Sequence, residues 1–211
     1  LFIQSIIQYN NKISVSAYDI VDGKLLWEIS RDISSHYTPY DLYPALYSGN
    51  LLLPLDDKIE YINTNNGNIN RNYSDEDIDN IYFFNQNSIQ NNTMKFFIED
   101  IGYGYVVVDL DNNIKISSGP IDFDNPELGR WSNDVFVDVS SSGSVAAYKL
   151  PPDTDGETMK LWEENDNTSL RLVGVDEQNI SLLDMKNEQI TLLNAQLGTI
   201  IKSAPLLWPG E

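Results

Sequence analysis

The chain has 211 residues, of which 41% are hydrophobic and 11% aromatic, so it can bury a core and is not expected to be disordered. Its 13 basic and 32 acidic residues give a net charge of −19, which repels phosphate backbones and anionic lipids and argues against nucleic-acid binding. The absence of cysteine excludes disulfides, thiolate metal sites and thiol catalysis. No apolar run approaches the roughly 20 residues that cross a bilayer, so no membrane span is expected.

A short hairpin pattern recurs along the chain, beginning with residues 17–27. Each copy has two apolar or aromatic residues, then Asp or Asn, then Gly or Asn four places later. The acid or amide residues are Asp19, Asn63, Asp109 and Asn194, and their followers are Gly23, Gly67, Asn113 and Gly198. The steps between the first members are 44, 46 and 85 residues, so one copy is missing near residue 150. We expect it in Val145–Leu150, followed by an enlarged turn containing Gly156 and a second strand ending at Trp162.

The residue types explain the spacing. A side-chain oxygen of Asp or Asn at a strand end accepts hydrogen bonds from the backbone of the turn that follows. Gly, and less often Asn, tolerates the positive φ that such a turn requires. The pattern therefore predicts strand, tight turn, strand in every period.

The remainder of each period supplies further strands. Before the second hairpin, residues 44–55 and 58–61 read as strand, turn and strand, and residues 170–175 and 180–185 repeat this before the last hairpin. No segment of useful length shows helical periodicity. We therefore predict an all-β chain forming a single β-propeller domain, or a partial one, with about five four-stranded blades. The blades are expected at roughly 1–40, 41–80, 81–125, 126–168 and 169–211.

The segment Tyr18–Trp27, a strand followed by Asp, Gly, Lys and Trp, resembles the pyrroloquinoline-quinone-like (PQQ-like) repeat of quinoprotein and WD40-like propellers. Residues 43–68 follow the fuller order of that repeat. Trp27 is replaced at the same offset by Arg71, Ser117 and Lys202, and Trp162 comes two places late when counted from Gly156. Quinoprotein dehydrogenases of this family use about eight blades, Ca²⁺-bound PQQ, a catalytic Asp and often a vicinal disulfide. The chain has room for five blades and has no cysteine, so we expect neither PQQ nor catalysis.

The two ends of the chain bear on ring closure. The chain opens on strand-like residues 2–7, and Ser203–Trp208 resembles the opening strand of a further blade. One interpretation is that this strand completes the first blade and removes free edges. The other, which Leu1 in place of Met favours, is that the chain is excised from a larger propeller.

Several residues are candidates for catalysis or metal binding. His36 is the only histidine, lacks a nucleophile motif, and is expected in an exposed loop. Alternating carboxylates suit Ca²⁺, although none of them completes an EF-hand, and turn chemistry with a solvated acidic rim is the favoured interpretation. The weak calcium candidates are Asp109 and Asp111; Asp122, Asp124 and Glu127; and Asp153, Asp155 and Glu157. Residues 74–79 are expected to form a charged loop between blades.

Two surface signals remain. The tyrosines at 37, 40, 43 and 47 fit either an interaction patch or, as we favour, packing between blades. Four N-x-S/T sequons, at Asn72, Asn91, Asn167 and Asn179, permit a secretory location.

The expected function is a non-enzymatic protein-binding and scaffolding module of an exported, luminal or membrane-anchored protein. Luminal propellers of the endoplasmic reticulum, in a membrane-protein insertion complex and in stress-sensor kinases, are similar, as is a bacterial outer-membrane assembly lipoprotein. One alternative is a structural subunit of a surface layer or filament. Another is a hydrolase or lyase that uses Asp122 and Asp124 as acid and base.

Overall fold

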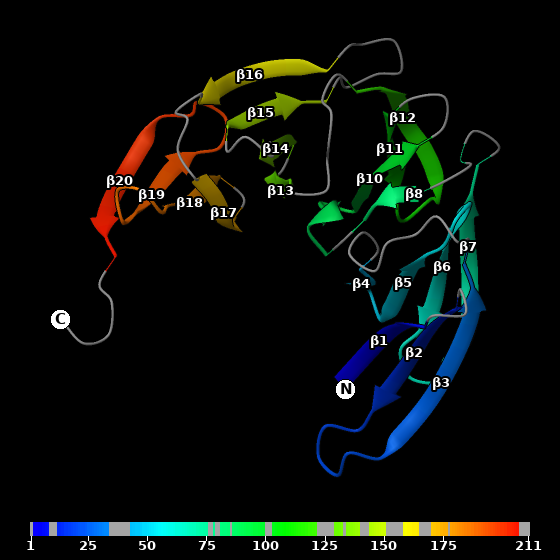
Figure 1. Cartoon of the computed structure of the whole chain (residues 1–211). Coiled ribbons are helices and arrows are strands. Elements are labelled where there is room, and N and C mark those ends of the chain that lie inside the picture. Colours follow the sequence, from blue (N-terminus) through cyan, green and yellow to red (C-terminus); the bar gives the residue numbers. More distant parts are fainter. Residues whose placement is uncertain are drawn as a thin grey trace. The chain divides into compact units, whose positions relative to one another are not determined.

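The computed structural model describes residues 2–8, 12–33, 43–75, 78, 81–84, 86–99, 103–121, 129–132, 134–139, 144–150, 158–164, 170–176 and 178–206. Apart from one 3-10 turn, Gln86–Ser88, the regular elements among these residues are β-strands, which confirms the all-β prediction (Figure 1). None of the helical structure described has the length and apolarity to span a bilayer.

The strands form five antiparallel sheets in chain order, which we call blades 1 to 5. Blade 1 contains β1 (Phe2–Gln8), β2 (Lys12–Tyr18) and β3 (Leu25–Asp32). Blade 2 contains β4 (Ala45–Tyr47), β5 (Asn50–Pro54), β6 (Lys58–Asn63) and β7 (Ile69–Ser74). Blade 3 contains β8 (Ile81–Phe83), β9 (Ile89–Gln90), β10 (Thr93–Glu99), β11 (Tyr103–Asp109) and β12 (Ile114–Pro120), with β9 beside β10.

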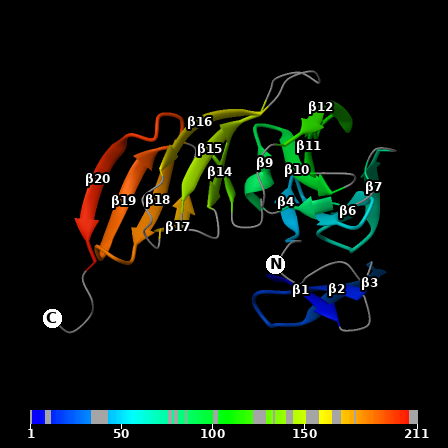
Figure 2. The same cartoon turned by 45° about the horizontal axis from the view of Figure 1, so that its top comes forward.

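Blade 4 contains β13 (Arg130–Ser132), β14 (Val135–Val139), β15 (Val145–Lys149) and β16 (Met159–Glu164). Blade 5 contains β17 (Leu170–Val175), β18 (Asn179–Asp184), β19 (Gln189–Asn194) and β20 (Ile200–Pro205), which lie side by side as one meander (Figure 2). Among the described residues, blades 2, 4 and 5 have four strands, blade 1 has three and blade 3 has five. Successive antiparallel sheets of about four strands are the blades of a propeller, as predicted. The chain divides into two compact units, Leu1–Lys115 and Ile116–Glu211, and the boundary falls within β12.

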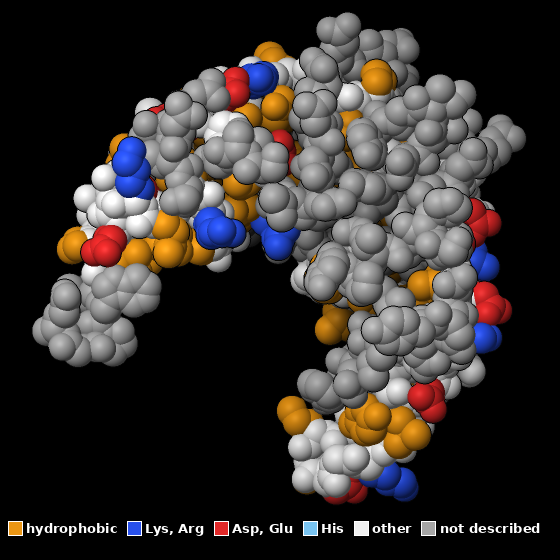
Figure 3. All heavy atoms as spheres, viewed as in Figure 1, with side chains coloured by type: hydrophobic (Ala, Val, Ile, Leu, Met, Phe, Trp, Pro, Cys, Tyr) orange, Lys and Arg blue, Asp and Glu red, His pale blue; other side chains and the backbone are white. Residues whose placement is uncertain are grey.

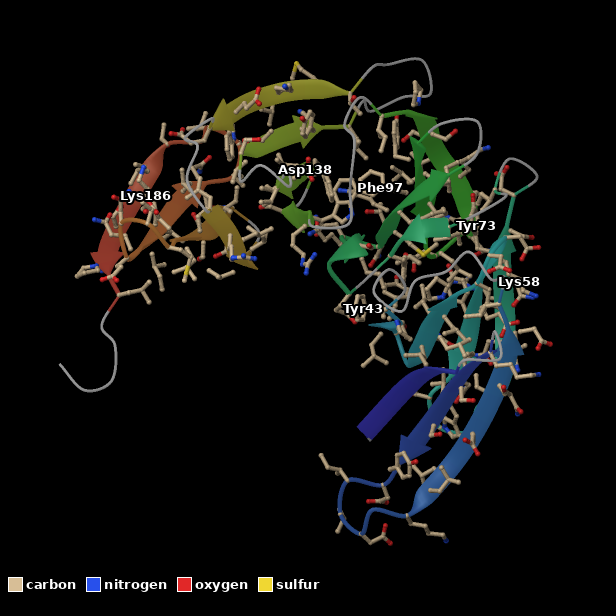
Figure 4. All side chains as sticks on the ribbon, viewed as in Figure 1. Tyr43, Lys58, Tyr73, Phe97, Asp138 and Lys186 are labelled. Carbon is tan, nitrogen blue, oxygen red and sulfur yellow. The ribbon has the colours of Figure 1, made fainter. Side chains whose placement is uncertain are left out.

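Neighbouring blades of each unit pack face to face through apolar side chains. Blade 1 contributes Ile13, Val15 and Ala17 to a cluster with Leu51 and Leu53 of blade 2. The opposite face of blade 2 packs on blade 3. There Tyr73, which is labelled in Figure 4, meets Phe96 edge to face, with the ring centroids 6.2 Å apart. In the second unit, the valines of β14 pack against Ile180, Leu182 and Leu193 of blade 5.

The missing fourth copy of the repeat is a real hairpin. β15 pairs with β16, and Ala147 lies opposite Trp162 just as Ala17 lies opposite Trp27. A β-bulge follows both alanines, so Trp162 keeps its structural place although its sequence offset is longer. Lys149 occupies the position of the turn acid, two residues after Ala147, and an ammonium group cannot accept the hydrogen bonds that close a tight turn.

The prediction for Ser203–Trp208 was wrong in its first half. Ser203–Pro205 belong to β20, the last strand of blade 5, where Ser203 pairs with Thr191 and Pro205 with Gln189. Proline has no N–H to donate, and as the last residue of this terminal strand it leaves the ladder intact. Residues 207–211 lie outside the described residues.

Candidate functional site in the inter-blade turns

The four turns of the recurring hairpin pattern that the structure describes share one geometry. The N–H of the fifth residue donates to the carbonyl of the first in all four, as follows: Gly23 to Asp19 at 2.9 Å, Gly67 to Asn63 at 2.9 Å, Asn113 to Asp109 at 2.8 Å, and Gly198 to Asn194 at 2.9 Å. The fifth residues have φ values of 71°, 73°, 58° and 66°, the left-handed region that favours Gly and Asn.

The first residue of each turn also uses its side chain. One side-chain oxygen accepts the N–H two residues ahead, namely Asp19 from Val21 at 2.7 Å, Asn63 from Asn65 at 2.9 Å, Asp109 from Asp111 at 2.8 Å, and Asn194 from Gln196 at 3.0 Å. This is the forward hydrogen bond that the sequence pattern predicts. Asp and Asn are interchangeable here because both offer the oxygen that the turn needs.

The carboxylates in the third turn are occupied by hydrogen bonds. The backbone N–H of Asn112, and then its side-chain amide, hold the pKa of Asp109 below its usual value. Asp111 accepts the Tyr47 hydroxyl at 2.9 Å and the Asn92 amide at 2.9 Å. The Asp109 oxygens serve the turn, and the Asp111 oxygens bind side chains outside it. No group of three or more potential metal ligands occurs among the described residues. The other two calcium candidates, Asp122, Asp124 and Glu127 with Asp153, Asp155 and Glu157, lie outside those residues.

Each of three turns receives a side chain from the preceding blade. Trp27 Nε1 donates to the Thr64 carbonyl at 2.8 Å, and Trp162 Nε1 donates to the Ala195 carbonyl at 2.8 Å. The Arg71 guanidinium donates to the carbonyls of Leu110 and Asp111. In all three cases the residue directly after the turn Asp or Asn supplies an acceptor. We call these the docking turns, and Trp27, Arg71 and Trp162 the docking side chains.

Glycine at the fifth position lets the indole lie on the turn. A Cβ at Gly67 would stand 3.0 Å from the Trp27 ring, and one at Gly198 would stand 2.7 Å from the Trp162 ring. Both distances are below ordinary contact, so a larger residue at either position would push the indole away from the turn. The third turn has Asn113 at this position, and there the docking side chain is Arg71, which lies 4.3 Å from the Tyr61 ring centroid.

In the sequence pattern Arg71 replaces Trp, which indicates that the tryptophan of the pattern is lost there. The structure shows instead that Arg71 keeps the role of Trp27 and donates to the turn of the next blade. Both side chains are flat and carry N–H donors, and Arg71 pairs with Tyr61 at the same bulge where Trp27 pairs with Ala17. The sequence signal for a docking side chain is therefore a residue with a planar N–H donor, Trp or Arg, at the offset of Trp27 from its own turn. Ser117, at the same offset in blade 3, is buried and has no planar donor, and Lys202 in blade 5 is exposed.

The remaining predicted residues fall in different places. Tyr47 lies between blades 2 and 3, where burial and the Asp111 carboxylate raise the pKa of its phenol. Tyr43 is exposed, and its backbone N–H donates to the Phe84 carbonyl at 3.0 Å. His36, Tyr37, Tyr40 and Gly156 lie outside the described residues.

Inter-blade ion pairs were not foreseen from the sequence. Arg31 Nε of β3 lies 2.7 Å from the carboxylate of Glu60 in β6, and Glu60 is buried. Lys115 Nζ lies 3.0 Å from Asp75, joining blade 3 to the end of blade 2. The partners are 29 and 40 residues apart in sequence, so a local sequence pattern carries no signal for either pair.

No protein-family model matches the chain, and no curated protein matches it. Among solved structures, BamB from Moraxella catarrhalis aligns with a TM-score of 0.56 and 17% identity over 95% of this chain and 60% of BamB. The computationally designed protein Ika8 gives 0.55 and 14% over 95% of this chain and 58% of Ika8. A europium-containing methanol dehydrogenase gives 0.53 and 11% over 98% of this chain and 49% of the dehydrogenase.

These similarities confirm the fold as a β-propeller of the PQQ-like type. The chain spans between about half and three fifths of the length of the structures that it matches. At such identities the likeness concerns architecture, because one propeller scaffold carries unrelated functions.

Proposed function

We propose that the chain is a non-enzymatic protein-binding and scaffolding propeller module of an exported, luminal or membrane-anchored protein. The observation that carries the proposal is the use of the polar side chains. In the described turns and joints, carboxylates and amides are hydrogen-bonded within the scaffold. Asn63 closes its own turn, and Asp111 joins blade 3 to Tyr47 of blade 2. Side chains committed in this way are not poised for acid–base chemistry on a substrate.

Exposed apolar side chains support the binding role. Ile20 and Val21 are 75% and 90% exposed, and Leu197 and Ile200 are 68% and 66% exposed. Two such pairs of large exposed apolar side chains, one in blade 1 and one in blade 5, favour association of this strongly acidic chain with other proteins. The acidic charge keeps the chain in solution and disfavours nucleic acid as a partner.

The binding role is tested by affinity purification of the full-length protein from the cells that make it, followed by identification of the proteins that come with it. A partner present in near-stoichiometric amount is the expected result. Turnover of a small substrate without any protein partner would favour the enzyme alternative, and Asp122→Asn with Asp124→Asn would then abolish it. A homopolymer seen by sedimentation would favour the filament alternative.

The sequons test the proposed location. Asn91 lies in the exposed turn between β9 and β10 with Thr93 two residues on, and Asn72 is exposed on β7. The Asn179 amide instead donates to both oxygens of Asp176 at 3.0 and 3.1 Å. Glycopeptide mapping of the native protein should find a glycan at Asn91 and none at Asn179. An unmodified chain in the cytosol would contradict the extracytoplasmic location.

A further inference from the structure

The turn between β6 and β7 contains the only Asn-Gly step of the sequence, Asn66-Gly67. An asparagine followed by glycine can cyclise, because a glycine has no side chain to hinder the attack of its nitrogen on the asparagine carboxamide. Asn66 is exposed to water, and Gly67 is half-buried beneath the docking side chain Trp27. A chemically labile step therefore lies at the joint between blades 1 and 2.

The native turn opposes this cyclisation. The Gly67 N–H, whose nitrogen must attack, donates to the Asn63 carbonyl at 2.9 Å. The Asn66 side-chain oxygen accepts the Asn68 N–H at 2.9 Å, which holds the carboxamide in one orientation. The Trp27 indole covers Gly67, where a Cβ would stand only 3.0 Å from the ring. Ring closure requires the backbone of the turn to rotate, so these hydrogen bonds must break and the indole must move away.

We propose that Asn66 is a site of spontaneous deamidation and that the docked Trp27 side chain controls the rate. The Gly67 nitrogen bonds to the Asn66 side-chain carbonyl carbon, and the carboxamide C–N bond breaks. The amide nitrogen leaves as ammonia with the proton from the Gly67 nitrogen. Water then adds to either carbonyl of the succinimide and opens the ring to aspartate or isoaspartate. The inference goes beyond the proposed binding function and does not depend on it.

The rate of the reaction is set by opening of the joint. A group that reacts only when the structure opens is modified at the unfolded-chain rate multiplied by the fraction of molecules that are open. Trp27 belongs to blade 1 and its indole donates to the Thr64 carbonyl in the turn of blade 2. The extent of modification at Asn66 should therefore record how often blades 1 and 2 have separated.

Aspartate, the first of the two products, fits the turn. Asp22 occupies the same place in the blade 1 turn, where its carboxylate accepts the Lys24 N–H at 2.9 Å, as Asn66 accepts the Asn68 N–H. Charged side chains of both signs already lie on the surface of the first unit, so one more exposed charge should have little effect (Figure 3).

Isoaspartate, the second product, does not fit. Its main chain runs through the side-chain carbon, so a carbon atom is inserted into the backbone of a turn that the Gly67 N–H and the Asn63 carbonyl close at 2.9 Å. The insertion displaces Gly67 from beneath the Trp27 indole. We expect the joint between blades 1 and 2 to remain weakened once isoaspartate has formed.

The test compares two tryptophans that lie on turns in different units. The native protein is incubated at neutral pH, and modification of Asn66 is followed by peptide mapping and by isoaspartate-specific methylation. Trp27→Ala should speed the modification by roughly a hundredfold, toward the rate of the urea-unfolded chain. Trp162→Ala opens the joint between blades 4 and 5 and should leave the rate at Asn66 unchanged.

Three further variants sharpen the test. Arg31→Met weakens the same joint without touching the turn, because Arg31 Nε lies 2.7 Å from the Glu60 carboxylate. It should also speed the modification, and it replaces Trp27→Ala in the comparison if that variant does not fold. Asn66→Gln should prevent the modification, because the longer side chain must close a larger ring. Asn66→Asp should keep the wild-type melting temperature.

Three results would overturn the inference. One is modification of the native protein as fast as that of the urea-unfolded chain, which would show that the turn gives no protection. Another is a rate in Trp27→Ala no higher than in Trp162→Ala, which would show that the indole does not control the reaction. The third is a protein carrying isoaspartate at position 66 whose blades 1 and 2 keep wild-type amide protection.

Discussion

Joints between blades depend on flat N–H donors rather than on tryptophan as such. Trp27 and Arg71 occupy the same strand position, and each donates to the carbonyl that follows the turn Asp or Asn. The fifth residue of the receiving turn decides which side chain fits. A Cβ at Gly67 would stand 3.0 Å from the Trp27 indole, whereas Asn113 has a side chain, and its amide donates to the Asn72 carbonyl at 3.0 Å. Residues about 40 apart are thus matched to each other.

This matching predicts a compensating pair. Arg71→Trp alone should destabilise the protein, because Asn113 has a Cβ at the position where a Cβ on Gly67 or Gly198 would meet the indole at 3.0 or 2.7 Å. Asn113→Gly together with Arg71→Trp should recover most of the loss, with a coupling energy of about 1–2 kcal/mol in a double-mutant cycle. Urea unfolding measures all four variants. Losses that simply add would show that the two positions do not share a joint.

The lowered pKa of Asp109 predicts that the protein loses stability in acid. Its pKa is lowered in the folded chain, chiefly by the Asn112 N–H, so its contribution to stability is present above the ordinary Asp pKa and is lost as pH falls through the lowered value. Asp109→Asn should keep the turn, as Asn63 and Asn194 do, and should remove this acid-dependent part. Urea midpoints at pH 7 and pH 3 test it, and an equal drop in both proteins would contradict it.

Tyr61 predicts a loss of stability at high pH. Burial raises the pKa of its phenol to about 12, so the folded chain holds the proton more tightly than the unfolded chain, whose tyrosine titrates near 10. Its contribution is present below pH 10 and is lost as pH rises through about 12, with an upper limit of about 3 kcal/mol. Tyr61→Phe should flatten the decline between these pH values in urea titrations, whereas Tyr43→Phe, at an exposed site, should not.

At the scale of the elements, ion pairs add to the apolar contact between sheets. Glu60 of β6 is 3% exposed and lies 2.7 Å from Arg31 of β3, with Lys58 Nζ at 3.6 Å. Arg31→Met removes the nearer cation and leaves a carboxylate buried, which should cost about 3 kcal/mol. The double variant Arg31→Met with Glu60→Met should lie close to wild type, because it removes both charges. A double variant less stable than the single one would contradict this account of the joint.

The elements that local chemistry determines were predictable. Turn residues act within five positions, so Asp19 with Gly23 and Asn194 with Gly198 mark hairpins without any knowledge of distant contacts. The joints were not predictable in this way, because Arg71 becomes recognisable as a docking side chain only when Leu110 is known to lie beside it. The prediction that Ser203–Pro205 opens a further blade failed for the same reason. These residues pair with β19, and that pairing outweighs their likeness to an opening strand.

At the scale of the whole molecule, each blade is stabilised by its neighbours. The cores join blade 1 to blade 2, blade 2 to blade 3, and blade 4 to blade 5, with one docking side chain at each of these joints. Stability in such an array is approximately a sum of blade terms and nearest-neighbour terms, so damage at one joint should remain local.

Hydrogen exchange tests this locality with two matched tryptophans. Trp162→Ala should increase amide exchange in blades 4 and 5, because it removes the bond to the Ala195 carbonyl and the indole packed on Gly198. Trp27→Ala should do the same in blades 1 and 2, through Thr64 and Gly67. Each should lower the stability of its own pair of blades by about 3–5 kcal/mol. The compact units Leu1–Lys115 and Ile116–Glu211 separate the two joints, so each variant should leave the other pair protected. Equal loss of protection in all five blades would show that the chain opens as one cooperative body and that coupling extends beyond neighbouring blades.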